Sequence, residues 1–326
     1  MSARSIPYHL RQNKAIDRNL FVELLSMVNR YFVVSKYEYI SMGGPFLEDF
    51  KVIHSATGIS RMISLEESDD VYRRQEFNRP LSCIKLVPEN SSTFIGRYQF
   101  EKPTIIWLDF TSPTKLASNL GDVYEVTTKL KPKDILKITL NANASAILKE
   151  RTPDDPEVLK RRLEELENEI GEFLPSDVDK TMVSNQAYPT LLFRVLELIL
   201  DKAVGSNSPN YFQKLASYAY ADGQTMLTFT GAILDRSETK NFMKETEIGK
   251  WSLGAVNRTD PVPIAVPELS IKERMYLDSL LPKFKAATLQ KRLSYLIADS
   301  EILSTEGLEN YVRYYKQFPY YSKVVV

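Results

Sequence analysis

The chain has 326 residues, 43% hydrophobic and 26% charged, which is enough for one large or two smaller domains with a buried core. Lysine and arginine together number 42, as do aspartate and glutamate. The zero net charge excludes a general attraction to nucleic acid or to an anionic membrane and leaves open a local basic patch that binds nucleic acid. Cys83 is the single cysteine, so no disulfide can form within the chain, and an intracellular protein is expected.

The N-terminal segment, MSARSIPYHLRQNKAIDR, is polar and basic and lacks the apolar core of a signal peptide. The longest apolar stretch, 188–204, is interrupted by Arg194, Glu197 and Asp201, which argues against a membrane span. We therefore expect a cytoplasmic protein that makes no use of a membrane. Apolar residues recur every four positions across 15–34, which predicts a helix within an N-terminal segment over 1–35.

Strand-like and helix-like segments then alternate along the chain. Strands are predicted at 37–42, 61–65, 83–87, 104–109 and 134–140, with helices at 45–55, 69–78 and 113–120. This alternation favours an α/β fold with a mostly parallel sheet and right-handed crossovers. A hairpin is predicted at 215–234, because Asp222 and Gly223 form a strong turn signal between two runs rich in aromatic and β-branched residues.

Two further helices interrupt the alternation. Apolar residues spaced by three or four predict an amphipathic helix over 153–173, and 188–204 predicts a more apolar one. Together they would form a helical insert or lid over about 151–205. Beyond the hairpin, 241–269 is loop-rich, 270–281 and 286–298 read as helices, and the aromatic tail is expected to pack on a core. The predicted domains are therefore an α/β domain over 36–240 and a C-terminal helical extension over 241–326.

The most informative stretch is KYEYISMGGPFLEDFKVIHSA, residues 36–56. A strand ends in Gly43 and Gly44 and passes at once into a helix, so a ligand can approach the backbone and the free N–H groups of the helix start. Glu66 and Glu67 follow the next strand about 20 residues later, where a carboxylate can reach ribose hydroxyls. The combination predicts a nucleotide-type pocket. A tight turn followed by a charged helix start is the purely structural alternative.

Asp109 ends the apolar run TIIWLD. A carboxylate at the carboxyl end of a central strand usually faces the crevice in which ligands bind, where it can orient or deprotonate a nucleophile. The alternative role is a helix cap formed together with Thr111 and Ser112.

Other candidate groups carry weaker signals. Arg73, Arg74 and Arg79 can hold a phosphate or carboxylate, although an exposed helix face with local ion pairs is the preferred interpretation. His9 and His54 are far apart and stand in no metal-binding motif, so no metal site is predicted.

A parallel five-strand series followed by an antiparallel hairpin resembles the class I S-adenosylmethionine-dependent methyltransferase fold, over roughly residues 36–235. The resemblance implies a Rossmann-like, mostly parallel sheet with an antiparallel terminal hairpin, and S-adenosylmethionine as the nucleoside cofactor. It implies a cofactor site after the first three strands and a catalytic acid after the fourth. The implied cofactor residues are Ser41, Gly43, Gly44 and Glu66 (or else Glu67), with Glu89 and Asn90 where the family often contacts adenine, and the implied catalytic residue is Asp109.

Two positions depart from the family pattern. Ser41 and Pro45 stand where spaced glycines are usual, and Asp109 is followed by Phe, Thr and Ser rather than by two prolines and an aromatic residue. Both departures argue against methylation of the amino group of a flipped base.

The predicted function is therefore methyl transfer to an oxygen or nitrogen acceptor. The first alternative is a catalytically inactive scaffold or binding subunit of a larger complex, held to a partner or a second copy through Leu163 and Leu166. A dinucleotide-dependent enzyme is a second alternative, against which the predicted hairpin argues.

Overall fold

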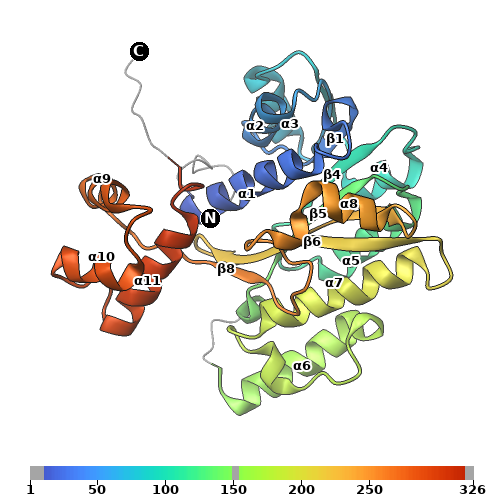
Figure 1. The fold of residues 1–326 in the computed structure, drawn as a ribbon. Helices are drawn as coiled ribbons and strands as arrows, with labels where there is room; N and C mark the ends of the chain where they lie inside the picture. Colours follow the sequence, from blue (N-terminus) through green and yellow to red (C-terminus); the bar gives the residue numbers. More distant parts are fainter. Residues whose placement is uncertain (1–10, 149–153, 320–326) are drawn as a thin grey trace. The chain divides into compact units, whose positions relative to one another are not determined.

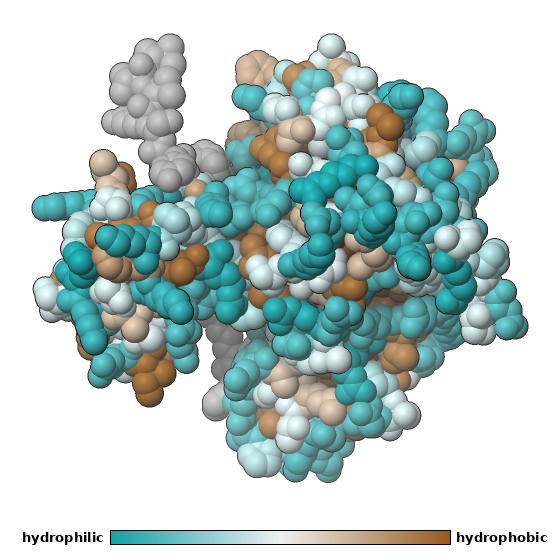
Figure 2. All heavy atoms as spheres, in the orientation of Figure 1, coloured by the Kyte–Doolittle hydropathy of each residue, from teal (hydrophilic) through white to brown (hydrophobic). Residues whose placement is uncertain are grey.

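A computed structural model describes residues 11–148 and 154–319. The chain forms two compact units, of which the first contains Val22–Ala219 and Gln224–Val262. The second contains Ile6–Phe21, Tyr220–Gly223 and Pro263–Val326. Hydrophilic side chains dominate the face drawn in Figure 2, with hydrophobic groups scattered among them.

The strands have the following bounds: β1 Glu38–Ser41, β2 Arg61–Leu65, β3 Ile84–Val87, β4 Thr104–Asp109, β5 Ile135–Asn141, β6 Asn210–Ala221, β7 Thr225–Asp235 and β8 Val262–Ile264. They form one sheet in the order β3-β2-β1-β4-β5-β7-β6-β8 (Figure 1). The strands β1 to β5 pair in parallel, and β7 runs antiparallel to β5. The carboxyl ends of the parallel strands therefore meet along one edge of the sheet, which we call the carboxyl edge.

One helix precedes the first strand, and the others lie between and after the strands. Their bounds are α1 Gln12–Val28, α2 Glu48–Thr57, α3 Asp69–Asn78, α4 Ser91–Arg97, α5 Leu116–Lys129, α6 Pro156–Ile170, α7 Tyr188–Val204, α8 Thr239–Thr246, α9 Ile271–Leu280, α10 Ala286–Leu293 and α11 Glu301–Tyr314. Short 3₁₀ turns occur at Val34–Lys36, Ala144–Ala146, Gly171–Phe173, Lys180–Val183 and Ile248–Lys250.

The sheet confirms the predicted α/β class, including the mostly parallel strands and the antiparallel hairpin that β6 and β7 form. Gly223, in the turn between them, has a φ of 95°, which a residue with a side chain rarely adopts. Within the described residues, no helix is long and apolar enough to cross a membrane.

Several predicted element boundaries were wrong for local reasons. The first helix ends at Val28 rather than near residue 34, and the Asn29 side chain accepts a hydrogen bond from Val34 N at 3.0 Å in the turn that follows. The helix predicted from residue 45 begins only at Glu48, because Gly44 and Leu47 both have a φ of 52°. The segment 241–269, predicted to be loop-rich, contains the end of α8 as well as β8. These boundaries depend on single turn residues, which periodicity does not register.

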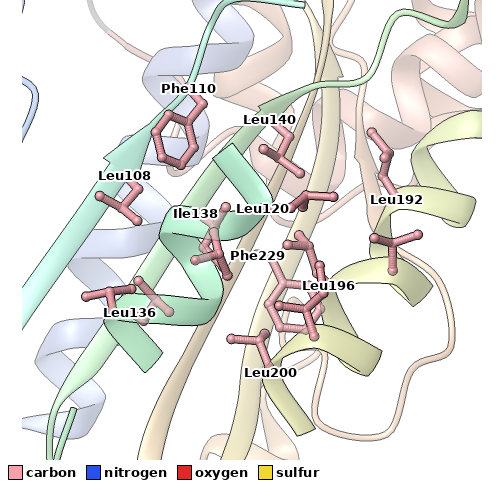
Figure 3. Close-up of a cluster of buried hydrophobic side chains, with 14 of the residues drawn as sticks. Leu108, Phe110, Leu120, Leu136, Ile138, Leu140, Leu192, Leu196, Leu200 and Phe229 are labelled. Carbon is pink, nitrogen blue, oxygen red and sulfur yellow. The ribbon is translucent and has the colours of Figure 1, made fainter. Parts of the chain in front are cut away.

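One face of the sheet is apolar and carries the core of the first unit. Leucine, isoleucine and phenylalanine side chains from β4, β5 and β7 pack against α5 and α7 (Figure 3). Leu136, Ile138 and Leu196 are fully buried there, and each such side chain contributes about 1.5–3 kcal/mol. This packing fixes the position of the strands whose ends form the carboxyl edge.

The opposite face carries a row of buried polar and aromatic side chains. Ser41 is in register with Ser64 on β2 and with Trp107 on β4, and Trp107 is in register with Lys137 on β5. Trp107 Nε1 donates to Thr139 Oγ1 at 2.9 Å, and Lys137 Nζ lies 4.8 Å from the centre of the Trp107 ring. Residues in register share a face, so this row leads along β4 to Asp109 at the carboxyl edge.

The amphipathic helix α6 uses its apolar side within the first unit. Leu166 and Ile170 are buried in the same core as α7, and Leu159 and Leu163 pack against it. The start of α6 is capped by Asp155, whose carboxylate accepts from Glu157 N and Val158 N at 3.0 Å. The partner surface predicted around Leu163 and Leu166 is therefore already covered by the chain itself.

In the second unit, the aromatic residues of the C-terminal segment pack as expected where the structure describes them. Tyr311 and Tyr314 are fully buried, and their hydroxyls donate to Asp278 Oδ1 at 2.5 Å and to Pro263 O at 2.8 Å. The Arg274 guanidinium lies 3.8 Å from the centre of the Phe318 ring. Tyr320, Tyr321 and His9 lie outside the described residues.

Candidate functional site

The turn between β1 and α2, residues 42–47, contains the two glycines that the sequence singles out, and we call it the glycine turn. A Cβ on Gly43 would lie 2.3 Å from Leu47 Cδ2, and 2.8 Å from both Phe50 Cε2 and Ser64 Oγ. Real Cβ atoms do not approach other atoms so closely, so a side chain at residue 43 would force Leu47, Phe50 and Ser64 to shift. The sequence predicts that a ligand approaches the backbone at this turn. At Gly43 it is core side chains of the protein that make this approach.

Two amide side chains of α3 hold the glycine turn. Gln75 Nε2 donates to Gly44 O at 2.9 Å, and Asn78 Nδ2 donates to Pro45 O at 2.9 Å. Gln75 is fully buried, and its Oε1 accepts from Ser64 Oγ at 3.2 Å. Sequence reasoning assigned Gln75 and Asn78 no role in holding this turn; the available signal was two amides three positions apart on one helix face.

The three arginines of this region do not gather around one point. The Arg74 guanidinium lies 5.1 Å from the centre of the Phe46 ring, which belongs to the glycine turn, whereas Arg73 and Arg79 are exposed. Only Arg74 of the three is placed beside the candidate site.

Glu66 and Glu67 differ although they are neighbours. Glu66 follows β2 directly and is half-buried, and its Oε1 accepts from Ser68 N at 2.9 Å just before α3. Glu67 is exposed and lies 3.3 Å from Lys115 Nζ in a pair whose side chains are both 58% exposed, an arrangement that contributes little to stability. The structure thus places Glu66 at the carboxyl edge and Glu67 in the solvent.

Glu89 and Asn90 follow β3, at the outer end of the parallel strands, and both have partners nearby. Arg97 Nε donates to Glu89 Oε2 at 3.0 Å, and a terminal guanidinium nitrogen of Arg97 contacts the other carboxylate oxygen. Asn90 Oδ1 accepts from Thr93 N at 2.8 Å and so caps α4. Both residues stand where an adenine contact was predicted, and both support local structure.

Asp109 is the last residue of β4 and is in register with Thr139 on β5. Its carboxylate is half-buried at the carboxyl edge, on the same face of the sheet as Ser41. The alternative role as a helix cap is not what the structure shows, because α5 begins at Leu116 with Lys115 at the cap position. Thr111 and Ser112 lie in the loop between Asp109 and that helix.

A small pocket opens beyond the ends of β4 and β5, and we call it the amide pocket. Asn141 Nδ2 donates to Thr111 O at 3.3 Å, and Asn143 Nδ2 donates to Gln224 Oε1 at 2.7 Å. Burial, together with the charge of Glu169, raises the pKa of the Tyr188 hydroxyl, which therefore stays protonated at neutral pH. The pocket is lined by Ser112, Pro113, Leu116, Asn119, Leu140, Asn141, Asn143, Ala146, Ile147 and Tyr188.

Sequence reasoning missed the amide pocket. The segment NANAS at 141–145, directly after the fifth strand, carried its signal, because amides at the carboxyl end of a parallel strand lie at the same edge as Asp109. The edge thus brings together Ser41, the glycine turn, Glu66 and Asp109 on three adjacent strands, with the pocket beside them. Within the described residues, no cluster of histidine, cysteine, aspartate or glutamate is arranged to hold a metal ion.

The strand order, with five parallel strands and an antiparallel β7 inserted beside β5, is that of the class I S-adenosylmethionine-dependent methyltransferases. The chain belongs to the family described as "Putative O-methyltransferase", whose model matches residues 6–326. The resemblance stated from the sequence is therefore confirmed. No curated protein sequence matches the chain significantly.

Solved structures with similar folds are distant. Trm1 from Pyrococcus horikoshii in complex with S-adenosyl-L-methionine is 12% identical, with a TM-score of 0.44 over 70% of this chain and 56% of that one. The N-methyltransferase NodS from Bradyrhizobium japonicum WM9 is 9% identical, with a TM-score of 0.35 over 67% of this chain and 97% of that one. A chain of the fibrillarin/Nop5p complex is 16% identical, with a TM-score of 0.29 over 41% of this chain and 62% of that one. At these scores the likenesses assign neither a cofactor nor an acceptor to this chain.

The residues at the carboxyl edge fit a nucleoside cofactor in part. Glu66 is a half-buried carboxylate at the end of β2, the type of group that accepts hydrogen bonds from two ribose hydroxyls. Gly44 has a positive φ in the turn between β1 and α2, where the backbone can face a ligand without a Cβ in the way. Glu66 also accepts from Ser68 N, and the carbonyl of Gly44 accepts from Gln75. The fit is carried by Glu66, Gly44 and Ser41, because Glu89 pairs with Arg97 and Asn90 caps α4.

Proposed function

We propose that this protein is an S-adenosylmethionine-dependent O-methyltransferase with its site at the carboxyl edge of the sheet. The observation that carries the proposal is that Glu66 and Asp109 are both half-buried at the ends of β2 and β4, on either side of β1 and its glycine turn. Two carboxylates so placed can serve different partners, one the cofactor and the other the acceptor. Membership of the O-methyltransferase family supports an oxygen acceptor.

Glu66 would hold the ribose hydroxyls, and the backbone around Gly44, together with Ser41, would face the amino-acid part of the cofactor. When bound, S-adenosylmethionine supplies an electrophilic methyl group, and its transfer leaves S-adenosylhomocysteine. The protein's part in such a displacement is to align and desolvate the nucleophile rather than to activate it strongly.

Asp109 would orient the acceptor hydroxyl and take its proton as the new bond forms. The amide pocket can take no more than one small hydrogen-bonding group of the acceptor, because its cavity of about 10 Å³ is the size of a single water molecule; Asn119, Asn141 and Asn143 lie there beside the apolar Leu116 and Leu140.

A catalytically inactive binding protein is the competing function. It is favoured by the glycine turn, where the space beside Gly43 is filled, and by Glu89 and Asn90, which support local structure. Both functions retain the same fold, so only ligand binding and methyl transfer distinguish them.

Calorimetric titration of the full chain with S-adenosylmethionine, S-adenosylhomocysteine and NAD tests the proposal. We expect the two sulfur nucleosides to bind at one site per chain and NAD to give no saturable heat. Saturable binding of NAD alone would favour a dinucleotide-dependent enzyme, and no binding of any of them would favour the inactive scaffold.

Methyl transfer is tested by incubating the protein and methyl-labelled S-adenosylmethionine with a cell extract. We expect label in an acceptor fraction and a rate lower by about 10²–10⁴-fold in Asp109→Asn, with cofactor affinity unchanged. Equal labelling by Asp109→Asn and the unmodified protein would remove Asp109 from the proposed role.

A further inference from the structure

The turn between α10 and α11, in the second unit, exposes several large hydrophobic side chains within a few residues. Figure 2 shows hydrophobic side chains at the surface over these C-terminal helices. Ile297 N donates to Ser304 Oγ at 3.0 Å, so the turn folds back against the first part of α11 and brings the groups together. The members of this apolar patch are Tyr295, Leu296, Ile302 and Leu303, with exposed fractions of 48%, 49%, 71% and 51%.

Charges of opposite sign flank the apolar patch. The basic side is formed by exposed residues of α10 and of the segment before it: Lys283, Lys285, Lys291 and Arg292. The acidic side is formed by exposed residues of α11 and of the segment before it: Asp299, Glu301, Glu306 and Glu309. Within the described part of the chain, none of these charged groups forms an ion pair, although Lys283 and Arg292 lie over the Phe284 ring, 5.3 Å and 4.5 Å from its centre.

The geometry of α11 places the acidic and apolar groups together. Ile302, Glu306 and Glu309 follow one another at i, i+4 and i+7, which is one face of a helix. The opposite face carries Leu308 and Tyr311, which are fully buried. The outward face of α11 is therefore apolar at its start and acidic over the next two turns, and it ends in the exposed, basic Arg313 at i+11.

We propose that the apolar patch is the centre of an interface between two copies of this chain. A two-fold axis through the patch would place Ile302 and Leu303 against the same residues of the second copy. It would also bring the basic side of each copy against the acidic side of the other, so that both sets of charges gain partners. This self-complementary order of basic, apolar and acidic groups is what a two-fold symmetric interface requires.

The charge pattern favours a second copy over other occupants. A nucleic acid or an anionic membrane would be attracted by the basic side and repelled by Glu306 and Glu309. An interface built on one small apolar patch is of the modest size that gives a reversible, concentration-dependent association.

Sedimentation equilibrium of the full chain tests the proposal directly. We expect a monomer–dimer equilibrium up to roughly 100 µM protein, the range in which small interfaces associate. The variant Ile302→Glu/Leu303→Glu is expected to sediment as a monomer throughout. Phe77→Glu is the matched control, because Phe77 is 91% exposed on α3 of the first unit, and this variant should associate like the unmodified chain. Circular dichroism establishes that each variant is folded.

A charge exchange sharpens the test. Lys291→Glu/Arg292→Glu and Glu306→Lys/Glu309→Lys should each associate at least tenfold more weakly alone, because like charges then face each other. Mixed in equal amounts, the two variants should form heterodimers, since opposite charges again meet at both sides. A monomeric unmodified chain, or variants that associate as it does and show no rescue on mixing, would overturn the proposal.

Discussion

The two ends of the carboxyl edge differ. At the β1–β2 end, protein atoms fill the space beside the glycine turn, whereas at the β4–β5 end amide and hydroxyl side chains line a pocket. In the turn, Leu47, Phe50 and Ser64 occupy the space beside Gly43, and Gln75 binds the carbonyl of Gly44. In the amide pocket, Asn141 and other polar side chains contact loop atoms near the surface.

The comparison shows that the same edge is sensitive to substitution for two reasons. A change in the glycine turn disturbs packing before it can affect a ligand, so loss of binding in a Gly43 variant would not identify a ligand contact. A change in the amide pocket removes a polar side chain with little packing cost. Ligand binding must therefore be tested by substituting side chains, such as Glu66, that do not hold the glycine turn in place.

The largest effect on folding is expected for Gly43→Val. The added side chain would overlap Leu47, Phe50 and Ser64, and we expect a loss of about 3 kcal/mol in the free energy of unfolding. Urea denaturation measures it. Gly121→Ala is the matched control, because nothing lies within 4 Å of its Cβ in the middle of α5, and it should stabilise the protein by up to about 1 kcal/mol. Equal stability of the two variants would contradict the filled turn.

Asp134 is a buried acid that lies just before β5, at the opposite end of this strand from the amide pocket. Its carboxylate accepts from Thr104 N at 2.7 Å and Lys131 N at 2.8 Å, and burial raises its pKa from 3.8 to about 6. Between these values the folded state holds a proton that the unfolded state has lost, so stability falls as pH rises.

For Asp134 we expect this fall to be about 2–3 kcal/mol between pH 4 and pH 7. The measurement is the difference in unfolding free energy between the unmodified protein and Asp134→Asn at both pH values. Relative to Asp134→Asn, the unmodified protein should be less stable at pH 7 than at pH 4 by that amount. A constant difference would show that Asp134 titrates normally in the folded state.

Gln75→Leu should open the glycine turn while leaving the rest of the core intact. The buried amide bonds both Ser64 and Gly44, and its loss is expected to cost about 2 kcal/mol. Hydrogen exchange should become faster in residues 42–47. Arg73→Leu changes the exposed side of the same helix and should leave that exchange as it was; if the two variants behave alike, Gln75 does not hold the turn.

The smallest effect is expected in the amide pocket. Asn143→Ala removes the contact with Gln224 near the surface and the hydrogen bond from Ser145 N that caps a short 3₁₀ turn, and it should change the unfolding free energy by about 1 kcal/mol. Thermal unfolding of this variant beside Gly43→Val tests the comparison of the two ends. A loss as large as that of Gly43→Val would mean that the pocket is as much a packing element as the turn.

Much of the fold follows from sequence patterns that local physics explains. β4 is an apolar run that begins after Pro103 and ends in Asp109, and α7 is an apolar run of helical spacing, so both were predicted with the bounds that the structure has. By contrast, α4 begins with two serines and a threonine, and it was missed. It depends on the Asn90 cap and on a hydrogen bond of 2.5 Å from Ser91 to Asp122, a residue distant in sequence.

The candidate site was predictable in part for the same reason. Glu66 and Asp109 follow strands directly, and the sheet order brings their positions to one edge. The filled space beside Gly43 and the role of Gln75 arise from contacts between separate elements, which spacing within one segment does not reveal. The adenine contact predicted at Glu89 and Asn90 stays a prediction, now weighed against their contacts with Arg97 and Thr93.

The most direct test of the central claim is calorimetric titration of S-adenosylmethionine into the unmodified protein, Glu66→Ala and Glu67→Ala. The two glutamates are adjacent, but Glu66 is half-buried at the carboxyl edge and Glu67 is exposed. We expect the unmodified protein and Glu67→Ala to bind equally, and Glu66→Ala to bind at least roughly tenfold more weakly, a difference of about 1.4 kcal/mol, with circular dichroism showing that all three proteins are folded. Equal affinity in all three proteins, or no binding to the unmodified protein, would contradict the account.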